Sequence, residues 1–338
     1  MISENLILEV KGMKKYFPIR TGLMKKVTGH VRAVDDVDMY IREGETYGLV
    51  GESGCGKTTL GRCILRAIEP SGGETLFRTT EGEMISINDL KYNDLRAIRK
   101  DMQLIFQDPY SSLNPRMTVL NIVGEPLVCN HMMSGKALRQ RVLDLIVMVG
   151  LDGRHLERYP HAFSGGQRQR IGIARALATN PRFIVCDEAV SALDVSVQAQ
   201  ILNLLQDLQS KLNLSYLFIS HDLGVIQHIS DRVGVMYVGK MMETAATGEL
   251  FKNPYHPYTE ALLSAKPIPD PRIKSKRIVL TGEVPNPANP PSGCYFHPRC
   301  RYAKDICSTT TPALIEVSKD HFSACHFSKE LKLQGVGI

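Results

Sequence analysis

The chain has 338 residues, room for roughly two domains at about 150 residues each, and 43% of them are hydrophobic, which is ample for a packed core and excludes general disorder. No apolar run reaches the roughly 18 residues that a membrane-spanning helix needs. The segment Met1-Ile2-Ser3-Glu4 lacks the basic residues, followed by an apolar stretch, with which a secretory signal begins. The net charge of +6, from 41 basic and 35 acidic residues, is typical of an ordinary solvated surface and does not indicate nucleic-acid binding. The composition therefore predicts a soluble protein of the cytosol.

Strand patterns alternate with helical ones along the first 250 residues. Strands are predicted over residues 5–10, 31–50, 182–186 and 215–220, the last two as buried apolar runs. Helices are predicted over residues 57–68, over much of 95–150, over roughly 136–149 with Ser134 as N-cap, and over 195–211. This alternation predicts an α/β fold with a mostly parallel sheet and ligand chemistry at the carboxyl edge of its strands.

A glycine-rich segment between a predicted strand and a predicted helix has the phosphate-loop pattern G-x-x-x-x-G-K-[ST]. Its glycines let backbone N–H groups wrap phosphates, and the helix N-terminus adds a favourable dipole. Lys57 would reach the β- and γ-phosphates of a bound nucleotide, and the Thr58 hydroxyl would ligate Mg²⁺. The residues assigned to nucleotide binding here are Gly51, Ser53, Gly54, Cys55, Gly56, Lys57, Thr58 and Thr59.

Two adjacent acids follow the buried strand predicted over residues 182–186. Asp187 is placed to contact Mg²⁺ directly or through water. Glu188 has the chemistry and the position to orient and polarise an attacking water. An exposed turn would be the ordinary place for two acids, but the interior run before them argues against that interpretation.

The segment Phe163-Ser164-Gly165-Gly166-Gln167 opens a helix predicted to run through Ala178. Ser164 can cap this helix, and the two glycines let its N-terminal amides approach an anion closely. Alone, this is an ordinary capped helix. Its position between the phosphate loop and Asp187 makes the chain resemble the ATP-binding cassette of ABC transporters, whose signature is this Ser-Gly-Gly-Gln stretch, over essentially the first 250 residues. The resemblance adds Ser164, Gly165, Gly166 and Gln167 to the nucleotide-binding residues.

Four further residues match motifs of the resembled family. Gln107 looks like the Q-loop glutamine, which contacts Mg²⁺ and the attacking water, although a surface turn at Asp108-Pro109 is the alternative. Asp194 looks like part of the D-loop at the dimer interface. His221 occupies the switch-histidine position, where an imidazole can hydrogen-bond the γ-phosphate. Tyr16 matches the aromatic residue that stacks on adenine, and Phe17 is the alternative.

The resemblance implies the fold of the P-loop NTPase ABC cassette. This fold has a mixed, mostly parallel core sheet, an antiparallel N-terminal sheet and a helical subdomain, here at about 92–165. We place the cassette at 1–250 and a small irregular extension at 251–338, because prolines interrupt regular elements after about Pro254. Since the phosphate loop lies far upstream, in a domain with its own sheet, we expect nucleotide binding to survive replacement of Cys300 or Cys307 in the extension by Ser.

One chain does not supply an obvious clamp for the outer side of the γ-phosphate. In the resembled family, the residues that match Ser164 and Gly166 provide it across a head-to-tail dimer. ATP then holds the dimer together and hydrolysis releases it, a cycle that can move attached membrane proteins between two states.

The extension indicates which class of ABC transporter the chain resembles. Residues 253–263, 282–285 and 290–300 resemble the C-terminal region of dipeptide and oligopeptide importer ATPases, and 105–116 together with Cys55 is similar to the second of the two paired ATPases in those systems. This implies a non-identical ATPase partner, two transmembrane permease subunits, an extracytoplasmic peptide-binding protein, and a peripheral location on the cytoplasmic face of the membrane. Relatives that move nickel or oligosaccharides share this tail, so those cargoes stay open.

Four cysteines lie in the last 45 residues, with spacings that are not those of a zinc finger: Cys294, Cys300, Cys307 and Cys325. Four thiolates suffice for tetrahedral zinc or for a [4Fe–4S] cluster, and simple buried thiols are the third possibility. The resemblance favours the cluster, in a structural role. His297, His321 and His326 are rival ligands.

Two other functions compete with the importer ATPase. A soluble ABC ATPase of translation or DNA repair usually has two cassettes or a long coiled-coil insertion, and the sequence shows neither. An iron–sulfur redox protein with an incidental nucleotide site is disfavoured by the complete set of hydrolysis residues.

Overall fold

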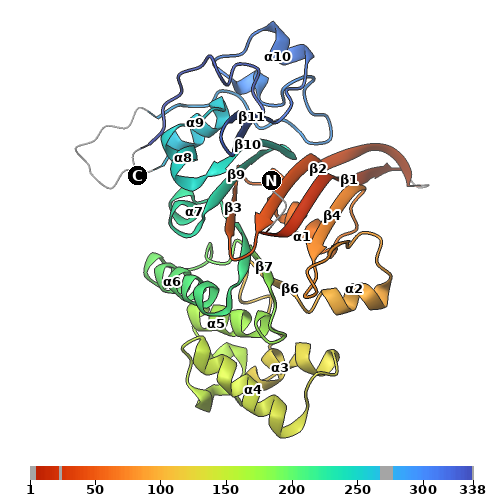
Figure 1. Ribbon diagram of the computed structural model, residues 1–338, viewed down its shortest axis with the longest axis vertical. Helices are drawn as coiled ribbons and strands as arrows, with labels where there is room; N and C mark the ends of the chain where they lie inside the picture. Colours follow the sequence, from red (N-terminus) through yellow and green to blue (C-terminus); the bar gives the residue numbers. More distant parts are fainter. Residues whose placement is uncertain (1–4, 23–24, 267–276, 337–338) are drawn as a thin grey trace. The chain divides into compact units, whose positions relative to one another are not determined.

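The computed structural model describes residues 5–22, 25–266 and 277–336 (Figure 1). Outside this range lie residues 1–4, on which the expectation of no secretory signal rests, and residues 267–276 of the predicted extension. The chain forms two compact units, each assembled from separate segments. The first unit consists of the described residues up to Ile7, Arg42–Glu45 and Asp89–Ile219, and the second of Leu8–Ile41, Thr46–Asn88 and the described residues from Ser220 onward. The division at residue 250 stays a prediction.

The first unit contains three parallel strands, β6 (Met102–Ile105), β7 (Phe183–Asp187) and β8 (Ser215–Ile219), in the order β6-β7-β8. Every residue of β7 and β8 is buried, as their apolar runs predict. The mostly helical prediction for 95–150 was wrong at β6. This strand has only four residues, and its register with β7 decides its conformation more than its own pattern does.

Helices make up most of the rest of the first unit, and α3, α4 and α5 gather in one group (Figure 1). The predicted helix over 136–149 is confirmed as α4 with Ser134 as its N-cap. The helices of this unit are α2 (Tyr92–Ile98), α3 (Val119–Cys129), α4 (Gly135–Met148), α5 (Gly165–Ala176) and α6 (Val195–Leu212), with short 3₁₀ helices η2 (Gly153–His155) and η3 (Pro160–Ala162).

The predicted antiparallel N-terminal sheet is confirmed. Its strand order is β2-β1-β4-β5, and it lies almost wholly in the second unit. The strand predicted over 5–10 extends to Thr21, and the pattern over 31–50 comprises two strands separated by a turn in which Gly44 has a φ of 73°. The strands concerned are β1 (Leu6–Thr21), β2 (Lys26–Arg42), β3 (Thr46–Val50), β4 (Gly72–Arg78) and β5 (Met84–Ser86).

The second unit also contains five strands of mixed direction, in the order β11-β12-β10-β9-β3. β3 pairs in parallel with β9 (Arg232–Tyr237), which pairs antiparallel with β10 (Lys240–Ala246). β10 in turn pairs with β12 (His321–Ser323), and β12 with β11 (Ile315–Ser318). Strands of the predicted extension therefore continue the sheet that contains β3.

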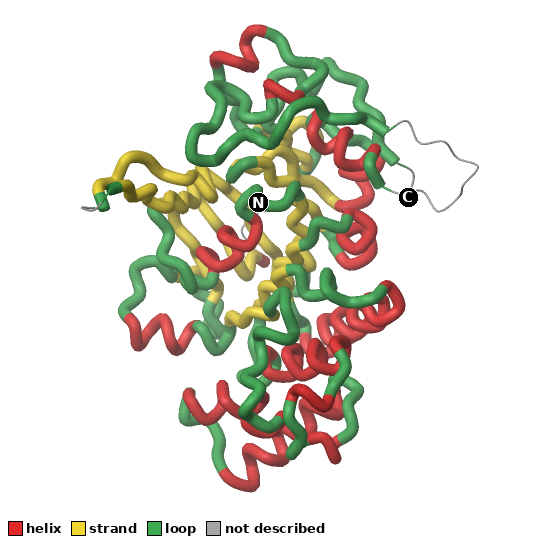
Figure 2. Tube along the Cα trace, turned by 180° about the vertical axis from the view of Figure 1, so that it is seen from behind, coloured by secondary structure: helices red, strands yellow, loops and turns green. Residues whose placement is uncertain are grey.

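The helices of the second unit are short, and much of the chain after α9 is loop (Figure 2). They are α1 (Lys57–Ile64), α7 (Leu223–Ile229), α8 (Thr247–Lys252), α9 (Pro257–Ser264), α10 (Asp305–Thr309) and the 3₁₀ helix η4 (His297–Arg299). The helix predicted to reach Ile68 ends at Ile64, and Arg66 beyond it has a left-handed φ of 49°. No helix in the described part of the chain is long and apolar enough to cross a membrane.

Candidate functional site

The phosphate loop joins β3 to α1, which is the strand–loop–helix context that its pattern requires. α1 begins at Lys57, directly after Gly56, and no side chain caps its N-terminus. The first amides of this helix therefore keep the capacity to bind an anion, and the helix dipole favours negative charge there.

Two glycines of the loop are required by close packing. A Cβ on Gly51 would lie 2.2 Å from the carbonyl oxygen of Met236, and one on Gly56 would lie 2.0 Å from that of Ala33. Gly56 also has a φ of 104°, in the region that side chains disfavour. The backbone of β9 and β2 thus determines the shape of the phosphate loop.

Lys57 is buried and folded across the loop. Its Nζ donates to the carbonyl oxygens of Gly51 at 2.8 Å and Glu52 at 3.1 Å, and lies 3.7 Å from Cys55 Sγ. Burial raises the pKa of the Cys55 thiol, and the charge of Lys57 opposes this rise. The ammonium group therefore already lies at the loop that would hold the phosphates.

The other phosphate-loop residues occupy two positions. Ser53 and Gly54 are exposed at the tip of the loop, whereas Thr58 and Thr59 are half-buried in the first turn of α1. The Thr58 hydroxyl is an oxygen donor of the kind that Mg²⁺ prefers.

His221 lies at the same cavity as the phosphate loop. A cavity of about 340 Å³ is lined by Gly51, Glu52, His221, Asp222 and Leu223, together with Leu262 of α9 and the two residues that directly follow this helix. Asp222 caps α7 by accepting from the backbone N–H groups of Gly224 at 2.7 Å and of Val225 at 3.2 Å. Within the second unit, the structure therefore brings His221 and the phosphate loop together.

The first unit brings Gln107 and Glu188 together. Gln107 Nε2 donates to Glu188 Oε2 at 2.7 Å. Asp187, the last residue of β7, is 1% exposed. Glu188 has a φ of 48°, a left-handed conformation that is costly for a residue with a side chain, and its N–H donates to the carbonyl oxygen of Ile219 at 3.0 Å. The strand pairing of β7 and β8 thus fixes the backbone of Glu188, and Gln107 holds its carboxylate.

The Ser-Gly-Gly-Gln stretch forms a complete capping box at the start of α5. Ser164 Oγ accepts from the N–H of Gln167 at 3.3 Å, and Gln167 Oε1 accepts from the N–H of Ser164 at 3.0 Å. A Cβ on Gly166 would lie 2.4 Å from a methyl group of Val197 in α6, whereas one on Gly165 would make only ordinary contacts. The exposed Ser164 hydroxyl therefore stands at a tightly packed helix start.

Asp194 is the N-cap of α6. Its carboxylate accepts from Ser196 Oγ at 2.7 Å and from the N–H of Val197 at 3.0 Å. These hydrogen bonds, that of Ser196 first, lower the pKa of Asp194. The residue is exposed, and its contacts within the chain are those of a helix cap.

Tyr16 is tied by its hydroxyl to a buried carboxylate. It donates to Asp35 Oδ1 at 2.5 Å, while Tyr295 donates to Asp35 Oδ2 at 2.7 Å. Burial, followed by the hydrogen bond to Asp35, raises the pKa of Tyr16 above its ordinary value. The guanidinium of Arg32 lies 6.0 Å from the centre of the Tyr16 ring. Phe17, the alternative, is 37% exposed.

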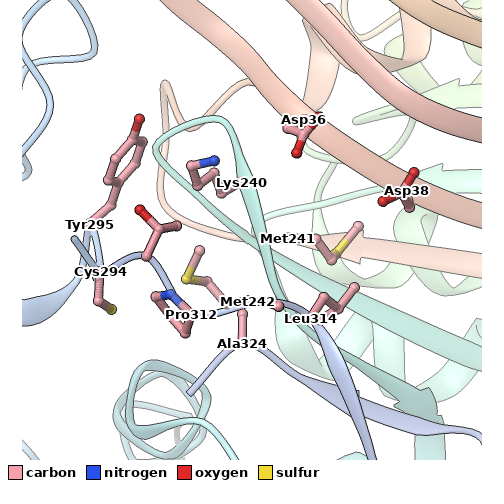
Figure 3. A pocket seen from close by; sticks show the side chains of 12 residues that line it. Asp36, Asp38, Lys240, Met241, Met242, Cys294, Tyr295, Pro312, Leu314 and Ala324 are labelled. Carbon is pink, nitrogen blue, oxygen red and sulfur yellow. The ribbon is translucent and has the colours of Figure 1, made fainter. Parts of the chain in front are cut away.

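Tyr295 belongs to the predicted extension and is adjacent to Cys294. Figure 3 shows the cavity beside these residues, of about 390 Å³, in which the Tyr295 hydroxyl and the Cys294 thiol point in opposite directions. Lys240 Nζ lies 3.4 Å from Asp35 Oδ2 and 5.2 Å from the centre of the Tyr295 ring. The extension therefore contacts the residue that holds Tyr16.

The four cysteines of the extension line one small cavity, of about 20 Å³, together with His297 and His326: Cys294, Cys300, Cys307 and Cys325. Burial raises the pKa of Cys300 to about 11 and that of Cys325 to about 12, so without a cation they are neutral thiols. Among the described residues, no three His, Cys, Asp or Glu side chains are positioned to hold one metal ion.

The third rival ligand is engaged elsewhere. His321 Nε2 lies 2.7 Å from Glu243 Oε1, and both side chains are fully buried. The same carboxylate accepts from the N–H groups of Tyr255 and His256. His321 therefore serves the packing of β10 and β12.

Comparison with known proteins assigns these features to a family. Residues 34–191 match the ABC transporter family, and residues 242–307 match the family described as the oligopeptide/dipeptide transporter, C-terminal region. The chain is 52% identical to the oligopeptide transport ATP-binding protein AppF of Bacillus subtilis over 96% of this chain and 98% of that relative. It belongs to the ATP-binding subunits of the ABC transporters. It is therefore an ATPase, and ATP and Mg²⁺ are the expected nucleotide and ion.

Other relatives agree with this assignment. The dipeptide transport ATP-binding protein DppF of Haemophilus influenzae is 49% identical over 96% of this chain and 98% of that relative. Among solved structures, a dimeric post-hydrolysis state of the ATP-binding cassette MJ0796 bound to ADP and Pi matches with a TM-score of 0.61 and 30% identity, over 71% of this chain and 98% of that one. The predicted ABC cassette fold is therefore confirmed.

Sequence reasoning missed the groups that surround the predicted ATP-binding residues. Glu52 lies inside the phosphate-loop pattern, at one of its variable positions, and bonds to Arg299 of the extension. An acid within an anion-binding loop is a signal that could have prompted a search for a cation. Asp35 and Tyr295, which hold Tyr16, had no such signal.

Proposed function

We propose that this chain energises an importer of dipeptides or oligopeptides by binding and hydrolysing ATP at the cytoplasmic face of the cell membrane. The observation that carries this proposal is similarity, along nearly the whole chain, to ATP-binding proteins named for oligopeptide and dipeptide transport. The match to the oligopeptide/dipeptide transporter C-terminal region points the same way. We assign the cassette to residues 1–250, with its helical subdomain at about 92–165, and the extension to 251–338.

The proposed partners are a second, non-identical ABC ATPase, two transmembrane permease subunits and, through the complex, an extracytoplasmic peptide-binding protein. Ser164 and Gly166 would act on the nucleotide of the second ATPase. Their support is the exposed, capped start of α5, where a hydroxyl and helix amides can meet an anion. Asp194 would face the same partner.

In the second unit, the phosphate loop would bind the phosphates of ATP, and Lys57 would turn from the loop carbonyls toward them. His221 would hydrogen-bond the γ-phosphate, which its place at the same cavity as the loop supports. Tyr16 would stack on adenine, with its hydroxyl held by Asp35.

In the first unit, Glu188 would accept a proton from the attacking water, and Gln107 would position the carboxylate and the water. The hydrogen bond between these two residues supports this pairing. Asp187 of this unit and, in the second unit, Thr58 each offer an oxygen ligand of the kind that Mg²⁺ prefers. A bound Mg²⁺ supplies charge neutralisation at the phosphate oxygens.

Transport assays test the cargo. The chain, its partner ATPase, the permeases and the binding protein would be reconstituted in vesicles, and ATP-dependent uptake of labelled dipeptide, oligopeptide, Ni²⁺ and oligosaccharide compared. Uptake of a peptide supports the proposal, whereas uptake of only Ni²⁺ or only oligosaccharide would show that the cargo is not a peptide. Failure to associate with any permease would favour a soluble ABC ATPase instead.

Purified alone, the chain should hydrolyse ATP slowly, and adding the partner ATPase and permeases should accelerate it by roughly 10²-fold, the usual effect of supplying fixed donors to developing charge. The partner would contribute its Ser-Gly-Gly-Gln helix start to the nucleotide held by this chain. Phosphate release measured for each combination of subunits is the test. A full rate from the isolated chain would contradict the shared site.

The four-cysteine cavity supports a [4Fe–4S] cluster as the ligand of the extension. Four thiols that line one cavity are the ligand set that such a cluster takes, and tetrahedral zinc takes the same set. The resemblance to the importer ATPases favours the cluster. When bound, the cluster would supply four metal–sulfur bonds that tie the loops of the extension together.

Replacing Cys300 by Ser should remove this ligand. We expect loss of iron, acid-labile sulfide and the visible absorption band after anaerobic purification, and faster proteolysis around residues 280–330. Cys129→Ser, at an exposed cysteine outside the extension, is the matched control and should keep full iron content. Stoichiometric zinc without iron would refute the cluster, and the absence of any metal would leave four reduced thiols.

A further inference from the structure

The extension reaches the phosphate loop through Arg299. Arg299 Nη1 donates to Glu52 Oε2 at 2.8 Å, and Nη2 donates to Glu52 Oε1 at 3.2 Å, a two-pronged ion pair. The Arg299 side chain is 9% exposed and that of Glu52 is 25% exposed. Both residues lie in the second unit, although 247 positions separate them in the sequence.

Glu52 is the second residue of the phosphate loop, and its backbone is engaged on both sides. Its N–H donates to the hydroxyl of Tyr258 in α9 at 2.9 Å, and its carbonyl oxygen accepts from Lys57 Nζ at 3.1 Å. When Lys57 turns to the phosphates, that second bond is lost. The ion pair with Arg299 and the bond to Tyr258 then remain to keep this part of the loop in place.

Further contacts restrain the side chain of Arg299. Nη1 also lies 3.2 Å from the hydroxyl of Tyr237, at the end of β9. The rings of Tyr237, Tyr258 and Phe296 pack against one another, with centres 4.7 to 5.3 Å apart. The guanidinium therefore approaches the loop from a packed aromatic layer and loses little conformational freedom on pairing.

The charge of Glu52 gives this contact a role in nucleotide affinity. A carboxylate inside a loop that binds a polyanion repels the phosphates unless a cation neutralises it. Among the described residues, Arg299 is the cation that pairs with the Glu52 carboxylate. Without Arg299, the loop would carry an uncompensated negative charge toward the triphosphate.

We propose that Arg299 of the extension is a positioning residue of the ATP site, which neutralises and orients Glu52 of the phosphate loop and thereby sets nucleotide affinity. The inference rests on the proposed binding of ATP by this loop. It makes the extension a part of the nucleotide site.

Titration of the full-length chain with the slowly hydrolysed analogue adenylyl imidodiphosphate and Mg²⁺ tests this proposal. Arg299→Met should weaken binding by roughly tenfold, as expected for uncovering one like charge near the phosphates. Adding Glu52→Gln to that variant should recover most of the lost affinity, because the repelling charge is gone. A residue with a merely structural role would not show this recovery.

Arg301→Met is the matched control. Arg301 flanks Cys300 on the other side and pairs with Glu260 of α9 at 3.0 Å. Its loss should leave the affinity for the analogue unchanged, and Tm measures the stability that each variant loses. Arg299→Lys keeps the charge without the planar fork, should fold, and should lose affinity only a few-fold.

Unchanged affinity in Arg299→Met, an equal loss in Arg301→Met, or no recovery with Glu52→Gln would overturn the inference. If Arg299→Met does not fold, Arg299→Lys alone and with Glu52→Gln decides by the same comparison. Absence of binding by the wild-type chain would refute the proposed ATP-binding function, and the inference with it.

Discussion

Replacing Glu188 by Gln should abolish steady-state ATP hydrolysis and leave ATP binding intact. The amide keeps the shape of the side chain, and its oxygen can still accept the hydrogen bond from Gln107 Nε2. It cannot take a proton from water, so the rate should fall by about 10²- to 10⁴-fold, the usual contribution of a positioned general base. The bound ATP should then accumulate in a closed dimer with the partner ATPase.

Phosphate release from the reconstituted complex at saturating ATP measures this loss, and size-exclusion chromatography with ATP measures the trapped dimer. Glu157→Gln is the matched control, because Glu157 is an exposed residue of the same unit whose carboxylate pairs with Arg139. It should hydrolyse ATP at the wild-type rate. A near wild-type rate in Glu188→Gln would remove Glu188 from the base role.

The hydrolysis motifs were predictable because their chemistry lies in contiguous residues. The phosphate loop requires a strand before it and a helix after it, and β3 and α1 are both present. The strand that ends at Asp187 was predictable as well, since a short apolar run that ends in acids indicates a buried central strand with the acids at its carboxyl end. In both cases, the residues that identify the motif and the strand or helix next to it are adjacent in the sequence.

The contacts between distant segments were not predictable in this way. The distance in sequence between the phosphate loop and the extension suggested that nucleotide binding would be independent of the cysteines. The ion pair of Arg299 with Glu52 joins the two regions within one unit. Loss of the cluster that the four cysteines are proposed to bind should therefore weaken ATP binding without abolishing it. Arg299 directly precedes Cys300, so the loss would disturb its pairing with Glu52.

The left-handed backbone conformation of Glu188 could not be predicted from the sequence either. A left-handed φ at a non-glycine residue has no local signature in the sequence. It arises because the N–H of Glu188 must reach the carbonyl oxygen of Ile219 where β7 and β8 end. Tertiary pairing, and not the local pattern, sets this conformation, as it does for the short strand β6.

Replacing Lys57 by Ala should weaken nucleotide binding itself, in contrast to Glu188→Gln. The ammonium group would face phosphate in both the ground state and the transition state, so its loss would remove binding energy from both. A hydrogen bond from a charged group contributes about 1.5 to 3 kcal/mol, which corresponds to a loss of affinity of about 10- to 150-fold. Calorimetric titration with ATP and Mg²⁺ measures this change.

The interpretation of that variant depends on the loop keeping its shape. Lys57 Nζ bonds to the carbonyl oxygens of Gly51 and Glu52, so its removal also releases two contacts inside the loop. A Tm within about 2 °C of wild type, a shift that corresponds to roughly 1 kcal/mol, would show that a larger loss of affinity lies in phosphate binding. Lys252→Ala, an exposed lysine of the same unit, should bind ATP as the wild type does. Unchanged affinity in Lys57→Ala would contradict the assignment of Lys57 to the phosphates.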